Sequence, residues 1–152
     1  MRALVAIALV LAAAGCDSAD APTPLDASAG ALVATEADLL AARDAWLAAR
    51  PDRYRYSYTA RCEECSGGDV VTVEGMAVVA AESGYPEGRQ TLDDLFETAR
   101  GAFRPGYGGE VRLSQTVPRF PVLVRVGRTE PEPFPTSDVG LLLTVTGFET
   151  LR

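Results

Sequence analysis

The sequence contains no histidine, no lysine and no asparagine among its 152 residues. The missing histidine excludes Ser-His-Asp and Cys-His catalysis and removes the commonest general base near neutral pH. It also removes the commonest zinc ligand. Catalysis would have to depend on carboxylates, tyrosine, arginine or cysteine alone. The sequence therefore predicts a protein that is not an enzyme, with no catalytic residues, no metal site and no cofactor.

Positive charge is also scarce. All 14 basic residues are arginines, and they stand against 21 acidic residues, which gives a formal net charge of −7. Because nucleic-acid binding rests largely on contacts between basic side chains and phosphates, this balance argues against a nucleic-acid partner. The hydrophobic share of 47% is that of a globular protein, and the length predicts a single domain.

Long apolar runs are missing except at the N-terminus, where Ala3 to Leu11 follow the positive Arg2. This run is too short to span a bilayer and has the pattern of an export signal. The residues that follow, Leu-Ala-Ala-Ala-Gly-Cys ending at Cys16, resemble the lipobox of bacterial lipoproteins. We therefore expect residues 1–15 to be a lipoprotein signal peptide and Cys16 to carry the lipid. The alternative is an ordinary signal peptide cleaved at an Ala-x-Ala site.

This prediction places the protein in the bacterial cell envelope, attached to the membrane through the lipid on Cys16. Several acyl chains on one cysteine suffice for stable anchoring. Asp17 resembles an inner-membrane retention signal of enterobacterial lipoproteins, but the choice between the inner and outer membrane stays open. Residues 16–33 are rich in Ala, Ser, Asp and Pro, which predicts a flexible tether before a single α+β domain at residues 34–152.

Two helices are predicted from their capping patterns. Thr35 and Asp38 form a capping pair before a helix over residues 36–49, and Thr91 and Asp94 repeat it before a second helix that ends at Gly101. Apolar positions at helical spacing place Trp46 on the buried side of the first helix.

Three tyrosines alternate in the stretch 53–61, which is typical of a strand with Tyr54, Tyr56 and Tyr58 on one face. Arg53, Arg55 and Ser57 occupy the other face and suit solvent. One interpretation places the tyrosines in the core under the helices. The alternative is an exposed aromatic contact face made by Tyr54, Tyr56 and Tyr58.

Cys62 and Cys65 follow this strand with the spacing Cys-x-x-Cys. With Cys16 lipidated, these two remain as a pair, and we predict a disulfide between them. A redox site is disfavoured because no helix begins at the motif and because Glu63 and Glu64 raise the thiol pKa. Metal binding by the same cysteines and glutamates would lack a second ligand pair.

Further strands are predicted at residues 70–74 and 76–81 around a Glu74-Gly75 turn, and at 110–116, 121–127 and 140–148. The order is α-βββ-α-βββ. Short connections favour a mostly antiparallel sheet of about six strands with both helices on one face, an α+β fold.

Taken together, these residues resemble an uncharacterised family of small exported bacterial lipoproteins, a domain of unknown function. The resemblance covers residues 43–148 and rests on these positions: Trp46, Tyr54, Tyr56, Tyr58, Cys62, Cys65, Val71, Val73, Met76, Leu95 and Phe96. In that family a single residue separates the two cysteines, whereas two residues, Glu63 and Glu64, separate Cys62 from Cys65 here.

The leading hypothesis is a membrane-tethered, non-enzymatic binding or structural module of the cell envelope, with an envelope protein as one candidate partner. The alternatives are an inhibitor of an envelope enzyme, and a thiol-redox or metal-handling protein that uses Cys62 and Cys65.

Overall fold

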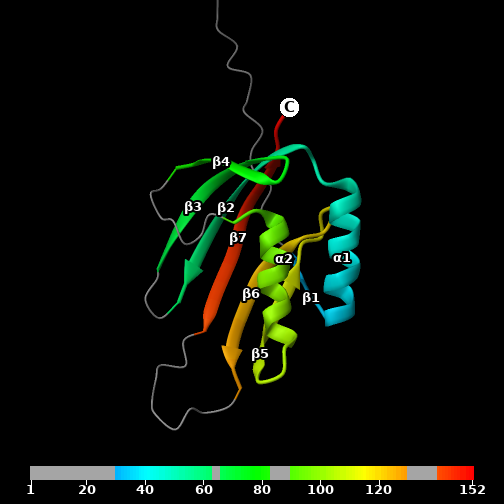
Figure 1. Ribbon diagram of the computed structural model, residues 1–152, viewed down its shortest axis with the longest axis vertical. Helices are drawn as coiled ribbons and strands as arrows, with labels where there is room; N and C mark the ends of the chain where they lie inside the picture. Colours follow the sequence, from blue (N-terminus) through cyan, green and yellow to red (C-terminus); the bar gives the residue numbers. More distant parts are fainter. Residues whose placement is uncertain (1–29, 63–65, 83–89, 130–139) are drawn as a thin grey trace, which may run out of the picture.

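The computed structural model describes residues 30–62, 66–82, 90–129 and 140–152 (Figure 1). Its elements in chain order are β1 (Leu32–Val33), α1 (Glu36–Ala49), β2 (Arg53–Arg61), β3 (Ser66–Glu74), β4 (Ala77–Ala81), α2 (Leu92–Arg100), a short 3-10 helix η2 (Gly101–Phe103), β5 (Tyr107–Leu113), β6 (Pro121–Arg128) and β7 (Leu141–Thr150).

The strands form one antiparallel sheet in the order β1-β5-β6-β7-β2-β3-β4. Figure 1 shows both helices on the same side of this sheet. The α+β class is therefore confirmed, but the sheet has seven strands among the described residues, whereas six were expected. The additional strand is β1, which lies in the segment predicted to be tether.

Strand β1 was missed because it has only two residues, too few to show an alternating pattern. Its pairing comes from distant partners: Leu32 lies opposite Leu113 and Val33 opposite Arg112. The backbone N–H of Ala34 donates to the Val111 carbonyl at 2.9 Å. These contacts bring the start of the domain to the edge of the sheet formed by β5.

Both helices begin at the predicted capping pairs. The Thr35 hydroxyl accepts a hydrogen bond from the Asp38 N–H, and the Asp38 carboxylate accepts one from the Thr35 N–H at 2.9 Å. Thr91 and Asp94 make the same reciprocal pair at the start of α2. Within the described ranges, neither helix has the length and apolar character that crossing a bilayer requires.

Four predicted strand boundaries were wrong by two residues or more. Strand β5 ends at Leu113 and not at Thr116, and β7 ends at Thr150 and not at Phe148. The other two boundaries lie in glycine-rich stretches. Strand β3 begins at Ser66 and not at Val70, and β5 begins at Tyr107 and not at Glu110. Glycine has no side chain to show which face it occupies, so these residues carry no strand pattern. Gly109 is required there, because a Cβ atom at this position would lie 1.8 Å from the carbonyl oxygen of Arg125 on β6.

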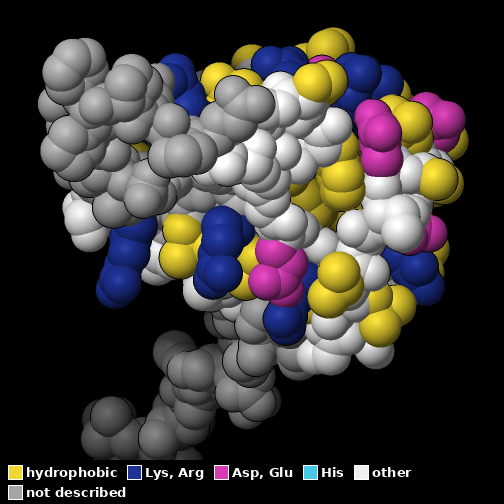
Figure 2. Space-filling view, turned by 90° about the horizontal axis from the view of Figure 1, so that it is seen from below, with side chains coloured by type: hydrophobic (Ala, Val, Ile, Leu, Met, Phe, Trp, Pro, Cys, Tyr) yellow, Lys and Arg dark blue, Asp and Glu magenta, His cyan; other side chains and the backbone are white. Residues whose placement is uncertain are grey.

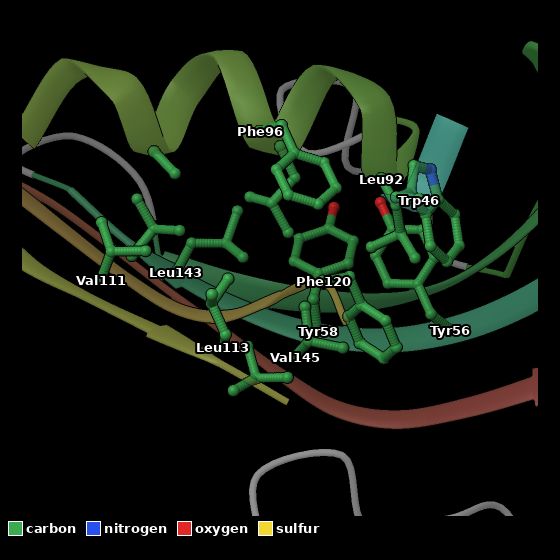
Figure 3. Close-up of a cluster of buried hydrophobic side chains, with 14 of the residues drawn as sticks. Trp46, Tyr56, Tyr58, Leu92, Phe96, Val111, Leu113, Phe120, Leu143 and Val145 are labelled. Atoms are coloured by element: carbon green, nitrogen blue, oxygen red, sulfur yellow. The ribbon is translucent and has the colours of Figure 1, made fainter. Parts of the chain in front are cut away.

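The core lies between the helices and the sheet, and Trp46 of α1 is fully buried in it (Figure 3). Its ring makes edge-to-face contacts with three aromatic rings at centroid distances of 5.5 Å to Tyr54, 5.7 Å to Phe120 and 6.1 Å to Phe148. Such pairs add to the stabilisation from burial. Trp46 therefore joins α1 to β2, to β7 and to the segment before β6.

Replacing Trp46 with alanine should lower the free energy of unfolding by about 3–5 kcal/mol, because the side chain is fully buried and its loss leaves a cavity. Leu47→Ala, at a position that is 45% exposed on the same helix, should change it by less than about 0.5 kcal/mol. Urea unfolding followed by circular dichroism measures both. A cost for Trp46→Ala no larger than that for Leu47→Ala would contradict the central place of this ring.

Candidate functional site

The three tyrosines of β2 are buried beneath the helices, with exposed fractions of 0% for Tyr54 and 3% each for Tyr56 and Tyr58. Figure 3 shows the rings of Tyr56 and Tyr58 within the core cluster between β2 and α2. The core interpretation is therefore confirmed. The alternative of an exposed aromatic contact face is wrong, because the helices cover the side of the sheet that these rings occupy.

The hydroxyls of two of these tyrosines hold the start of α2 against the sheet. The backbone N–H of Leu92 donates to the Tyr54 hydroxyl at 3.1 Å, and the Tyr56 hydroxyl donates to the Gln90 carbonyl. Burial raises the pKa of Tyr54 to about 12 and raises the pKa of Tyr56 as well. Both groups are therefore neutral at physiological pH and serve as structural hydrogen-bonding groups.

These pKa shifts predict a loss of stability at high pH. The folded-state pKa of both tyrosines lies above the unfolded value of about 10, so their contribution is full below about pH 10. The contribution is lost as the pH rises towards about 12. Absorbance at 295 nm, which follows phenolate formation, should rise for these two tyrosines together with the loss of circular dichroism. Ionisation of both near pH 10 in a protein that stays folded would contradict this.

No helix of the described residues covers the opposite side of the sheet, and we call the side chains on that side the open face. The strand registers align two rows of residues across it. The first row is Arg61, Leu142, Arg125 and Glu110. The second row is Thr59, Thr144, Leu123, Arg112 and Val33. Neighbouring strands lie about 4.8 Å apart, so Arg61 and Arg125 flank Leu142 at a Cα separation of about 10 Å.

The arginines of the open face differ in their partners. Arg55 pairs with Glu149 at 3.4 Å and with Glu82 at 3.8 Å, and Arg112 pairs with Glu110. Arg61 and Arg125 are exposed, and in the part of the chain that the structure describes neither makes an ion pair. Their guanidinium groups are therefore available to an anion from outside.

Aliphatic side chains lie between these arginines. Val33 is 68% exposed, and Leu123 and Leu142 are half-buried. Figure 2, seen from the end of the molecule where β6 and β7 are joined, shows basic side chains separated by hydrophobic and acidic ones along its lower edge. The open face thus offers both guanidinium groups and apolar surface to a partner.

A groove of about 580 Å³ lies at one end of the open face, where β5, β6 and β7 meet. Arg125 and Leu142 line it together with Gly108, Gly127 and Gly140. Two of the glycines allow close packing within the domain: a Cβ atom on Gly140 would lie 1.8 Å from the Val126 carbonyl oxygen, and one on Gly108 would lie 2.7 Å from the Thr129 side chain.

The charge of the described residues is balanced, although the whole chain carries −7. The excess acids lie outside the described ranges: Asp17, Asp20, Asp26, Glu63, Glu64, Glu87, Glu130, Glu132 and Asp138, against Arg2 and Arg89. Net charge alone therefore does not give the charge of the described part of the domain.

The three cysteines are only partly placed. Cys62 directly follows β2, whereas Cys16 and Cys65 lie outside the described residues. Lipidation of Cys16 and the Cys62–Cys65 disulfide therefore stay predictions. Among the residues the structure describes, no group of three His, Cys, Asp or Glu side chains gathers as metal ligands would.

Sequence reasoning placed Arg53, Arg55 and Ser57 on the solvent side of β2 but did not bring Arg61 and Arg125 together. Alternation along β2 was enough to place Arg61 on that face. The position of Arg125 depends on β7 lying between β6 and β2, and no local pattern records that arrangement.

Comparison with known proteins gives no match: no family model, no curated protein and no solved structure is similar to this chain at a significant level. The resemblance to a family of small exported lipoproteins therefore stays a prediction.

Proposed function

We propose that this protein is a membrane-tethered, non-enzymatic binding module of the bacterial cell envelope, and that the open face is its contact surface. The lipid on Cys16 anchors the chain, and the segment up to residue 30 links the anchor to the domain. The observation that carries the proposal is the pair of exposed arginines, Arg61 and Arg125, on a sheet face that neither α1 nor α2 covers.

The alternation of β2 supports this assignment. The tyrosines of this strand are buried in the core, and its arginines lie on the opposite side. One strand therefore both stabilises the domain and supplies part of the proposed contact surface. Arg61 lies on β2 and Arg125 on β6, which are both interior strands of the described seven-stranded sheet. Residues on such strands are held more rigidly than residues on loops.

The anchor is tested by Cys16→Ala. In cells that export the chain, the unchanged protein should remain in the membrane fraction after a high-salt wash and should incorporate labelled palmitate. The Cys16→Ala variant should lose the label, because the thiol that carries the acyl groups is absent. Cys62→Ala is the matched control, and it should keep both properties. Membrane retention and labelling that survive Cys16→Ala would refute lipid attachment at this residue.

The contact surface is tested by photo-cross-linking in intact cells. A photoreactive phenylalanine analogue at Thr59, which is exposed on the open face, should form adducts with an envelope component upon irradiation. The same analogue at Leu40, which is 40% exposed on α1, is the control and should form few adducts. Equal adduct yields at the two positions would contradict a contact surface confined to the open face.

A further inference from the structure

We propose that the partner of the open face is an anionic phospholipid surface, on which the domain lies with its two helices directed away from the bilayer. This inference rests on the proposed function, because the lipid anchor keeps the domain near the bilayer. It identifies the envelope component that the open face contacts as phospholipid. The acidic headgroups would be bound by Arg61 and Arg125, with Arg112 at the edge of the same face.

Charge complementarity is the first argument. Arg61 and Arg125 have no carboxylate partner within the described residues, so an anion can bind them without breaking an existing ion pair. Each arginine near an anionic bilayer strengthens association about fivefold. Removing both residues should therefore weaken association with the anionic bilayer about 25-fold.

The aliphatic side chains of the open face fit the same partner. Leu142 lies between the two arginines in the aligned row, and Val33 lies at the end of the neighbouring row beside Arg112. Arginine extends its apolar stem along apolar surface while its charged end reaches the headgroup region. Alternating guanidinium and aliphatic groups therefore match the boundary between headgroups and acyl chains, where both kinds of contact are available.

The path of the chain brings the β1 edge of the sheet close to the proposed anchor. Only about 15 residues separate Cys16 from β1, so even a fully extended segment spans at most about 50 Å. A flexible segment of this length has an end-to-end distance of about 20 Å. The segment joins the domain at β1, and Val33 of β1 lies opposite Arg112 on the open face. The anchor therefore holds the β1 edge of the sheet, with Val33 and Arg112, near the lipid at high effective concentration, and the arginines decide which face turns towards the bilayer.

The inference is tested on the lipidated protein in vesicles of phosphatidylcholine alone and in vesicles containing one third phosphatidylglycerol. Arginine modification by phenylglyoxal is followed by mass spectrometry. Arg61 and Arg125 should react at least fivefold more slowly in the anionic vesicles than in the neutral ones. The controls are Arg104, which follows η2, and Arg119, whose charge lies near Asp38 at the start of α1. Both are exposed, and their rates should be the same in the two lipids.

A second measurement separates the open face from the anchor. The Cys16→Ser chain produced without residues 1–15 has neither the apolar signal segment nor the lipid, and it should co-sediment with the anionic vesicles and not with the neutral ones. The double variant Arg61→Gln, Arg125→Gln should bind about 25-fold more weakly, whereas Arg104→Gln, Arg119→Gln removes the same charge and should change binding less than twofold.

The outcomes distinguish the inference from the function on which it rests. If the unmodified protein fails to sediment with neutral vesicles, the anchor is wrong, and the Cys16→Ser measurement still tests the open face. Equal modification rates for Arg61 and Arg125 in both lipids would overturn the inference while leaving the anchor intact. Equal losses in the two double variants would assign the binding to net charge and would overturn it as well.

Discussion

The fold depends on the burial of one aromatic cluster, in which Trp46 of α1 contacts Tyr54, Phe120 and Phe148. These contacts join a helix to rings from β2, from β7 and from the segment before β6, so they fix which side of the sheet is covered. Because α1 and α2 both pack on that side, neither of them covers the other side of the sheet (Figure 1). The same packing that stabilises the domain therefore creates the surface available for contact.

Strand β2 contributes both to the buried core and to the open face. Its tyrosines hold the start of α2 through Tyr54 and Tyr56, and its alternate residues must then point away from the core. Arg55 on that side is neutralised by Glu149 and Glu82, whereas Arg61 is not paired in the described part of the chain. The position of each arginine in the register, and not its presence in the strand, decides whether it is available to a partner.

The sequence predicted those parts of the fold that local patterns determine. Both capping pairs, the bounds of α1 and the strand 53–61 follow from residues close together in the chain, and all appear in the structure. Strand β1 could not be predicted, because two residues have no periodicity and its formation depends on β5. The sequence also did not show that Arg61 and Arg125 lie on either side of Leu142. Their proximity requires the sheet order β6-β7-β2, which no local pattern indicates. Local alternation gives the face of each residue, but only long-range pairing gives its neighbours.

The net charge of −7 is a poor guide to what this domain contacts. The acids in excess lie in segments outside the described residues, and screening at physiological ionic strength limits exposed charges to a range of about 8 Å. A surface that approaches the open face within that range contacts Arg61 and Arg125, which the net charge does not record. The composition therefore argues against binding to a long polyanion that would wrap the molecule, as nucleic acid does. It does not argue against a flat anionic surface held against one face of the sheet by a short tether.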